Sequence, residues 1–265
     1  MHLSFCLETL YTDEPFAQRL ASAHRDGVER IEVWEWRSKQ ALLRDALVTH
    51  GLTLTNLSAN RQYGMVEPDE RNHFLSEVEQ SARFAKEVGS AHIMLLAQPL
   101  TVDGRASSPS AGALSHWREH LLQAADQAVH CADRIGVDLL IEPLNDRNDH
   151  PDYLLNSSRL TFEIIREIHH PRLRVLYDIY HMSVMQEDVC KDIHENLDAI
   201  GYFHLADLPD RREPGRGRIN FKEIIQLLKA EGFHGVLGFE FFPTSTLHQQ
   251  IVRQTMDQFQ TWISC

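Results

Sequence analysis

The chain has 265 residues, of which 43% are hydrophobic, and it carries a formal net charge of −12 at pH 7. This length and apolar content permit one large α/β domain with a sizeable core, and they disfavour a disordered chain. The negative charge disfavours the classes of protein that bind the phosphate backbone of nucleic acid or an anionic lipid surface, because both would repel it.

The sequence predicts neither a membrane span nor a secretory signal. It has no run of about 18 apolar residues, and its first residues lack a basic head followed by an apolar stretch. The four cysteines are widely separated and form no CxxC, so they indicate neither a zinc knuckle nor a redox pair. We therefore expect reduced thiols and a cytoplasmic protein. The cysteines are Cys6, Cys131, Cys190 and Cys265.

Eight short apolar segments recur along the chain, and longer amphipathic segments separate them. Each short segment is β-rich or broadly apolar and has the length of a strand. In chain order, the predicted strands are 3–9, 30–36, 52–59, 91–99, 137–145, 173–181, 200–209 and 235–243.

The amphipathic segments between these strands carry helix signals. Four of them end at a glycine, which accommodates the left-handed conformation that follows many helices. Asn220 precedes the last of the four and is a good N-cap residue three positions before Glu223. The four helical segments are 13–27, 77–89, 115–136 and 221–232.

This eightfold alternation predicts an α/β protein with a (β/α)8 TIM barrel. A doubly wound open sheet is the main alternative. It usually has fewer strands, and its nucleotide-binding form needs a glycine-rich first turn, which the segment "ETLYTDEP" lacks. No linker or composition break divides the chain, so we expect one domain over residues 1–265.

Polar residues lie near the ends of the last four predicted strands, where barrel active sites form. Residues 142, 178, 204 and 240 are separated by 36, 26 and 36 positions, each about one strand–helix unit. Their side chains are therefore expected at a similar height on neighbouring strands. In strand order, the polar residues are Glu142, Asp178 with His181, His204 with Asp207, and Glu240.

Three carboxylates that face one another repel unless a cation lies between them. Together with a histidine they suit Mg²⁺, Mn²⁺ or Co²⁺ better than a structural zinc ion, which prefers thiolates. A single acid at a strand end is often a cap or an ion-pair partner. Four such residues on consecutive strands favour a divalent metal site formed by Glu142, Asp178, His204 and Glu240.

The stretches "IEPLN", "YDIYH", "FHLADLPDRREPGRGRIN" and "GFEFFP" resemble the hydroxypyruvate isomerase group of the xylose-isomerase-like TIM barrels. Sugar 3-epimerases of the tagatose/psicose type are relatives of that group. The resemblance covers the whole predicted barrel and is densest in residues 137–243. It implies catalysis by Glu142 and Glu240, metal binding by these two with Asp178 and His204, and substrate binding by His181 and Arg211.

Two departures from the family patterns leave the substrate open. Many hydroxypyruvate isomerases have glutamine where this chain has His204, and histidine is usual there in the epimerases. The epimerases also tend to carry an extra glutamate soon after the strand-5 ligand, and the segment "NDRNDH" has none.

We therefore predict a metal-dependent isomerase of the aldose–ketose type that needs no organic cofactor. Its small-molecule substrate would be a hydroxy-oxo acid, with hydroxypyruvate/tartronate semialdehyde or a 2-oxo-tetronate as examples. The first alternative is a ketose 3-epimerase or keto-inositol isomerase. A DNA-repair endonuclease with several zinc ions is disfavoured by the charge, and a non-catalytic metal-binding protein is the remaining alternative. We expect no nucleic-acid or membrane partner, and a homodimer or homotetramer is left open.

Overall fold

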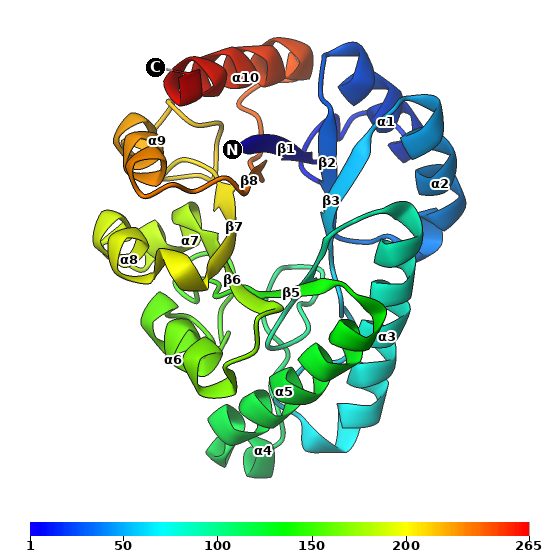
Figure 1. Cartoon of the computed structure of the whole chain (residues 1–265), viewed down its shortest axis with the longest axis vertical. Helices are drawn as coiled ribbons and strands as arrows, with labels where there is room; N and C mark the ends of the chain where they lie inside the picture. Colours follow the sequence, from blue (N-terminus) through cyan, green and yellow to red (C-terminus); the bar gives the residue numbers. More distant parts are fainter. Residues whose placement is uncertain (265) are drawn as a thin grey trace.

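Eight parallel strands form a barrel that helices surround (Figure 1). In the computed structural model, which describes residues 1–264, the strands are hydrogen-bonded in the order β3-β2-β1-β8-β7-β6-β5-β4. The remaining seam is held by one bridge, in which Ala59 N donates to Met94 O at 2.7 Å. The predicted TIM barrel is therefore confirmed. The strands are β1 His2–Cys6, β2 Arg30–Val33, β3 Thr53–Leu57, β4 His92–Leu95, β5 Asp138–Ile141, β6 Leu173–Asp178, β7 Ile200–Leu205 and β8 Val236–Phe239.

The helices confirm the predicted stop and start signals. Gly89 and Gly136 adopt φ angles of +77° and +86° after α3 and α5, and Asn220 accepts a hydrogen bond from Glu223 N at the start of α9. The α-helices are α1 Phe16–Arg25, α2 Gln40–Thr49, α3 Arg71–Val88, α4 Ala111–Ser115, α5 Trp117–Ile135, α6 Ser158–Ile168, α7 Ile179–Val184, α8 Val189–Asn196, α9 Phe221–Ala230 and α10 His248–Ser264, and the 3₁₀ turns are η1 Arg37–Lys39, η2 Pro68–Glu70 and η3 Leu197–Ala199.

The predicted strand 173–181 is wrong at its end. Strand β6 ends at Asp178, and helix α7 begins at the next residue. The Asp178 carboxylate accepts a hydrogen bond from His181 N at 3.0 Å and so caps this helix. The apolar run continues through the turn because α7 is also buried, so hydropathy alone does not mark the boundary. His181 therefore projects from a helix, not from a strand.

Alternation along the strands separates two apolar layers. One face of each strand packs against the surrounding helices and forms the large core. The other face points into the barrel, where a smaller apolar cluster lies. Its buried members are Met94, Leu140, Leu176, Tyr202 and Val236.

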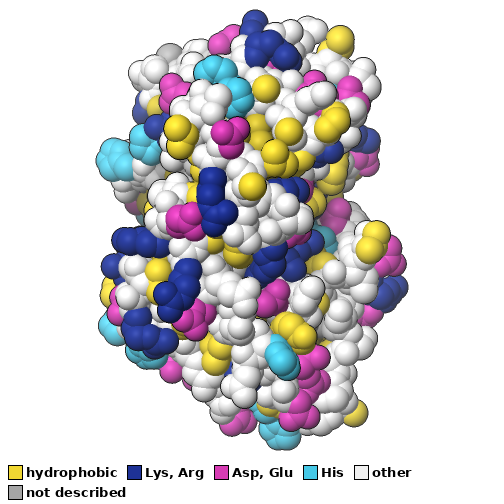
Figure 2. All heavy atoms as spheres, turned by 90° about the vertical axis from the view of Figure 1, so that its right-hand side faces the viewer, with side chains coloured by type: hydrophobic (Ala, Val, Ile, Leu, Met, Phe, Trp, Pro, Cys, Tyr) yellow, Lys and Arg dark blue, Asp and Glu magenta, His cyan; other side chains and the backbone are white. Residues whose placement is uncertain are grey.

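The face over α1 to α3, which Figure 2 shows, has basic and acidic side chains interspersed. None of the helices in residues 1–264 combines the length and hydropathy that a membrane crossing requires. Cys6, Cys131 and Cys190 are free thiols. Cys265, for which a reduced thiol is also predicted, lies outside the described residues.

Candidate active site

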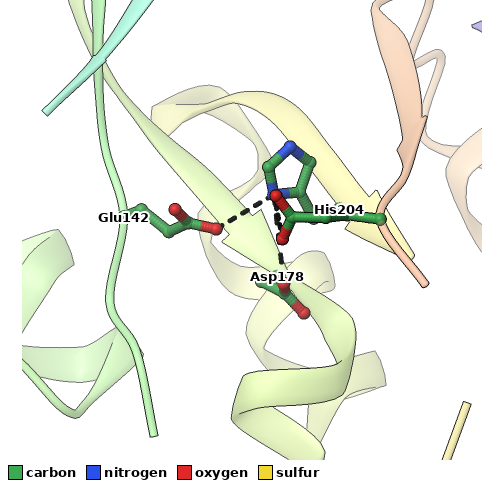
Figure 3. A group of neighbouring side chains, drawn as sticks. Glu142, Asp178 and His204 are labelled. Carbon is green, nitrogen blue, oxygen red and sulfur yellow. Dashed lines mark hydrogen bonds and ion pairs between the residues drawn. The ribbon is translucent and has the colours of Figure 1, made fainter. Parts of the chain in front are cut away.

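Four side chains converge at the carboxyl ends of β5 to β8. Glu142 and Glu240 each follow a strand by one residue, Asp178 ends β6, and His204 lies near the end of β7. One potential ligand atom from each residue lies within 4.8 Å of all the others, and all four side chains are buried. Figure 3 shows the carboxylates of Glu142 and Asp178 and the ring of His204 close together, at or near the ends of neighbouring strands. The structure thus brings together all four predicted metal-ligating residues, Glu142, Asp178, His204 and Glu240, which we call the tetrad.

The imidazole of His204 presents its two nitrogens to different neighbours. Its Nδ1 atom lies 3.0 Å from Glu142 Oε1, 3.5 Å from Glu240 Oε2 and 3.9 Å from Asp178 Oδ2. Its Nε2 atom lies 3.1 Å from Glu32 Oε2 on strand β2. Nδ1 is therefore the nitrogen that can join the three carboxylates in holding an ion.

The cluster buries three carboxylates close together, and the positive charges of Arg211 and of a protonated His204 compensate them only in part. Burial raises the pKa of Glu142 to about 7 and also raises the pKa of Asp178. Burial alone would raise the pKa of Glu240, but His204 and Arg211 hold it below its ordinary value. This oxygen-rich, single-nitrogen set fits a divalent cation, which would neutralise carboxylates that burial otherwise disfavours in their charged form.

The second predicted histidine, His181, is held as a neutral hydrogen-bond donor. The Asn145 side-chain oxygen accepts from the backbone N–H groups of Asn148 and Asp149, at 2.9 and 3.1 Å, so its amide nitrogen must face His181 Nδ1, at 2.6 Å. Since Nδ1 accepts, the proton of the neutral ring lies on Nε2. That buried Nε2 atom has no hydrogen-bond partner in residues 1–264, and His181 lines the cavity above the tetrad. It is available to a substrate oxygen.

Arg211 is carried by the loop that follows β7. Asp207, which the sequence placed among the polar strand-end residues, organises this loop instead of joining the tetrad. Its carboxylate accepts from the backbone N–H groups of Gly215, Gly217 and Ile219 at 2.9, 2.8 and 3.1 Å. A Cβ atom at Gly217 would lie 1.6 Å from Leu208 O, so only glycine fits there.

The loop directs the Arg211 guanidinium into the site. Arg211 is 7% exposed, pairs directly with Glu240 and lies 3.8 Å from Asp178. The resemblance implied that Arg211 binds the substrate, and the structure adds that its guanidinium pairs with Glu240 and lies near Asp178.

A cavity of about 390 Å³ lies over the tetrad. Trp34 lines it and donates from its indole nitrogen to Glu240, whereas Trp36 stacks on Phe84 in the core with ring centroids 4.4 Å apart. Arg61 and His150 complete the polar wall. A larger cavity of about 660 Å³ lies at the amino ends of the strands and contains no member of the tetrad.

Sequence reasoning missed Glu32. This side chain is 2% exposed and contacts His204 from the opposite side of the barrel. The available signal was an acid within the apolar segment "RIEVW", the same kind of signal that identified Asp178. Glu32 lies on β2, outside the four strands where the pattern of ligands was found.

The fold and site together define a parallel α/β barrel with a metal-type ligand set at the carboxyl ends of its strands. Residues 17–262 match the family described as Xylose isomerase-like TIM barrel, and the chain belongs to that family. A putative hydroxypyruvate isomerase of Mus musculus is 29% identical over 85% of this chain and 83% of its own length. A 2-oxo-tetronate isomerase of Cupriavidus necator is 28% identical over 89% of this chain and 91% of its own length. These relatives confirm the predicted resemblance and support an isomerase.

Solved structures share the fold at lower sequence identity. An AP endonuclease, family 2, from Brucella melitensis is 20% identical and superposes with a TM-score of 0.86, over 97% of this chain and 98% of its own. The IOLI protein, whose structure contains a bound zinc atom, is 18% identical with a TM-score of 0.81 over the whole of both chains. At these identities the likeness establishes the barrel fold alone.

Proposed function

We propose that this chain is a metal-dependent isomerase that interconverts a small hydroxy-oxo acid through an enediolate. The observation that carries the proposal is the buried set of two glutamates, one aspartate and one histidine at the mouth of the barrel. The 2-oxo-tetronate isomerase and hydroxypyruvate isomerase names of the relatives support an acidic substrate of this size.

The four side chains that would hold the ion are Glu142, Asp178, His204 and Glu240. A divalent ion there supplies Lewis-acid chemistry, which acidifies a C–H bond beside a carbonyl group. Magnesium, manganese and cobalt remain the predicted metals, since the donor set is mostly oxygen.

The protein's own groups would move the proton. One glutamate removes the proton from the hydroxyl-bearing carbon, the other returns a proton to the neighbouring carbonyl carbon, and the hydroxyl proton moves to the former carbonyl oxygen. Burial raises the pKa of Glu142 to about 7 in the metal-free site, and a bound divalent ion would favour the carboxylate form that accepts a proton. The Nε2–H group of His181 donates to the oxygen on which negative charge develops. Arg211 binds the substrate carboxylate as a charge-assisted donor.

The direct test is a substrate screen in deuterated water with Mn²⁺ or Mg²⁺ present. The panel contains hydroxypyruvate, tartronate semialdehyde, 2-oxo-tetronates and ketoses of five and six carbons. We expect a hydroxy-oxo acid to yield its isomer with deuterium at the reacting carbon. A protein that binds metal but exchanges no substrate C–H would be a binding protein, and the proposal would fail.

His204 supports one second candidate, a ketose 3-epimerase, because histidine is the usual strand-7 ligand in that group. The same screen distinguishes the two, since an epimerase would invert one carbon of a neutral ketose and leave the acids unchanged. The absence of an organic cofactor and the cytoplasmic location remain predictions, and a homodimer or homotetramer is left open.

A further inference from the structure

We propose that Glu32 is a positioning residue that fixes the ring of His204 so that Nδ1 faces the three carboxylates. This inference rests on the proposed metal site and adds a residue from the half of the barrel that carries no ligand. Glu32 lies on β2 and reaches His204 on β7, 172 positions later in the chain. The two side chains meet inside the barrel, and both are almost completely buried.

The contact with Glu32 provides an acceptor for the proton that a metal-binding imidazole keeps on its other nitrogen. A neutral imidazole has one donor and one acceptor nitrogen, and an ionised carboxylate can only accept. Both ring nitrogens face carboxylates, so a neutral ring that offered the lone pair of Nδ1 to an ion would keep its proton on Nε2, where Glu32 Oε2 can accept it at 3.1 Å. The lone pair then lies on Nδ1, on the side of Glu142 and Asp178. Histidines that bind metals commonly donate their other N–H group in this way.

A chain of hydroxyl groups holds Glu32 in place from below. Tyr202 donates to Glu32 Oε2 at 2.9 Å, because the carboxylate cannot donate. The Tyr202 oxygen lies 2.9 Å from Thr55 Oγ1, which also lies 3.1 Å from Ile31 O and 2.7 Å from Ser4 Oγ. Tyr202, Thr55 and Ser4 come from β7, β3 and β1, so three strands fix the position of one carboxylate on a fourth.

Gly238 on strand β8 lies beside the contact between Glu32 and His204. A Cβ atom at Gly238 would lie 2.7 Å from Tyr202 Cε1, 2.8 Å from Glu32 Oε1 and 3.0 Å from His204 Cδ2. Any side chain would displace the pair, and no positive φ angle at Gly238 requires glycine for conformational reasons. Gly238 is therefore required by the space that the side chains of Glu32 and His204 occupy.

The test compares Mn²⁺ affinity, measured by calorimetry, in the wild type, Glu32→Gln and Glu32→Asp. The first variant keeps the length and loses the charge, and the second keeps the charge and loses the reach to His204. We expect both to bind Mn²⁺ about 10- to 100-fold more weakly, as substitutions behind a ligating histidine do. Glu8→Gln is the matched control, since Glu8 pairs with Lys39 at 2.7 Å and does not contact the tetrad.

A second readout follows the proton directly. In ¹⁵N-labelled protein with Mg²⁺, the His204 signals, assigned by their loss in His204→Asn, should show a protonated Nε2 in the wild type and an altered tautomer in Glu32→Gln. A purely structural role would lower the melting temperature and leave both the tautomer and the affinity unchanged.

Unchanged affinity in both Glu32 variants would overturn this inference and leave the metal site standing. A wild-type protein that binds no divalent ion would overturn both. If the Glu32 variants do not fold, Tyr202→Phe tests the same idea, because it keeps the carboxylate and removes its donor. It should weaken Mn²⁺ binding about threefold or more, and wild-type affinity in that variant would then refute the role of Glu32.

Discussion

His204 and His181 lie at the same end of the barrel, and both are buried, but their surroundings differ in charge. The ring of His204 contacts the carboxylates of Glu32 and Glu142. The ring of His181 receives two N–H groups of Asn145, from the side chain at 2.6 Å and from the backbone at 3.3 Å. Both ring nitrogens of His204 face acceptors, whereas Nδ1 of His181 faces donors and its Nε2 lies 3.6 Å from Asp178 Oδ2.

The two pKa values move in opposite directions for this reason. Burial lowers the pKa of His181 well below its ordinary value, and the nearby Arg211 lowers it further. Burial would also lower the pKa of His204, but the carboxylates of Glu32 and Glu240 outweigh it and raise the pKa well above the ordinary value. Equal burial therefore does not give equal chemistry. Without a metal ion, the neighbouring carboxylates favour the protonated form of His204, and a divalent ion at Nδ1 would have to replace one of its protons. His181 remains neutral and can donate a hydrogen bond.

Substituting each histidine should have the largest effect, because it separates metal binding by His204 from hydrogen bonding to the substrate by His181. We expect His204→Ala to lose most of the bound divalent ion, because three ligands remain and their repulsion is less well compensated, and Asp178→Ala should do the same. His181→Ala should retain the ion and lose turnover. Metal content after gel filtration is the measurement. Wild-type metal content in both His204→Ala and Asp178→Ala would rule out the four-ligand site.

Glu142 and Glu240 should have different roles in proton transfer, one removing a proton from the substrate and the other returning it. Glu142→Gln and Glu240→Gln keep shape and one oxygen, so the site can still hold metal weakly, but each loses a proton acceptor. We expect kcat to fall at least ~10²-fold in each, the lower range for general acid–base catalysis. The variant that lacks the abstracting base should also fail to exchange substrate C–H with deuterated water. Near wild-type turnover with metal bound would reduce that glutamate to a ligand.

Arg211 contributes positive charge beside His181, and its removal should affect acidic substrates selectively. A charge-assisted contact contributes roughly 1.5–3 kcal/mol, so Arg211→Ala should raise KM for a hydroxy-oxo acid by about 10- to 150-fold. KM for a neutral ketose should change far less. Arg216→Ala is a control on the same loop, because Arg216 pairs with Glu213 at 3.1 Å and is largely exposed. Equal effects on acid and ketose would exclude a carboxylate clamp.

Asn145→Asp should convert the donor beside His181 into an acceptor. The oxygen that replaces the amide nitrogen would favour a proton on Nδ1, which leaves Nε2 without one in the neutral ring. We expect kcat to fall about 10-fold with metal content unchanged, a smaller effect than loss of a catalytic base. Asn148→Asp is the control, since only the backbone of Asn148 contacts Asn145. Unchanged turnover would mean that the tautomer of His181 does not matter.

The smallest expected effect is on stability in the metal-free protein. The pKa of Glu142 is raised from 4.5 to about 7, so folded protein retains a proton that the unfolded chain loses at lower pH. The stabilisation is complete below 4.5 and is lost as pH rises to about 7. With a chelator present, the melting temperature of the wild type should therefore fall relative to Glu142→Gln between pH 5 and pH 8. A constant difference would show that Glu142 does not titrate there.

The sequence by itself determined the barrel and the group of four residues that could hold a metal ion. Strand and helix periods are local properties, and the (β/α)8 repeat places residues one unit apart at the same height, so Glu142, Asp178, His204 and Glu240 could be grouped before any coordinates. The "YDIYH" segment marked His181 as a site residue through its resemblance to a family, although the pattern misplaced it on a strand.

Only the tertiary structure decided what surrounds these residues. Glu32 meets His204 across 172 positions, and Arg211 reaches Glu240 through a loop. Neither contact follows from a periodic pattern in the sequence. The Glu32–His204 contact depends on side-chain direction inside a closed barrel, and the Arg211–Glu240 contact depends on a loop held by Asp207. The protonation of His181 and His204 follows from those contacts. The type of residue at each site is therefore a property of the sequence, whereas its charge and the position of its proton depend on the fold.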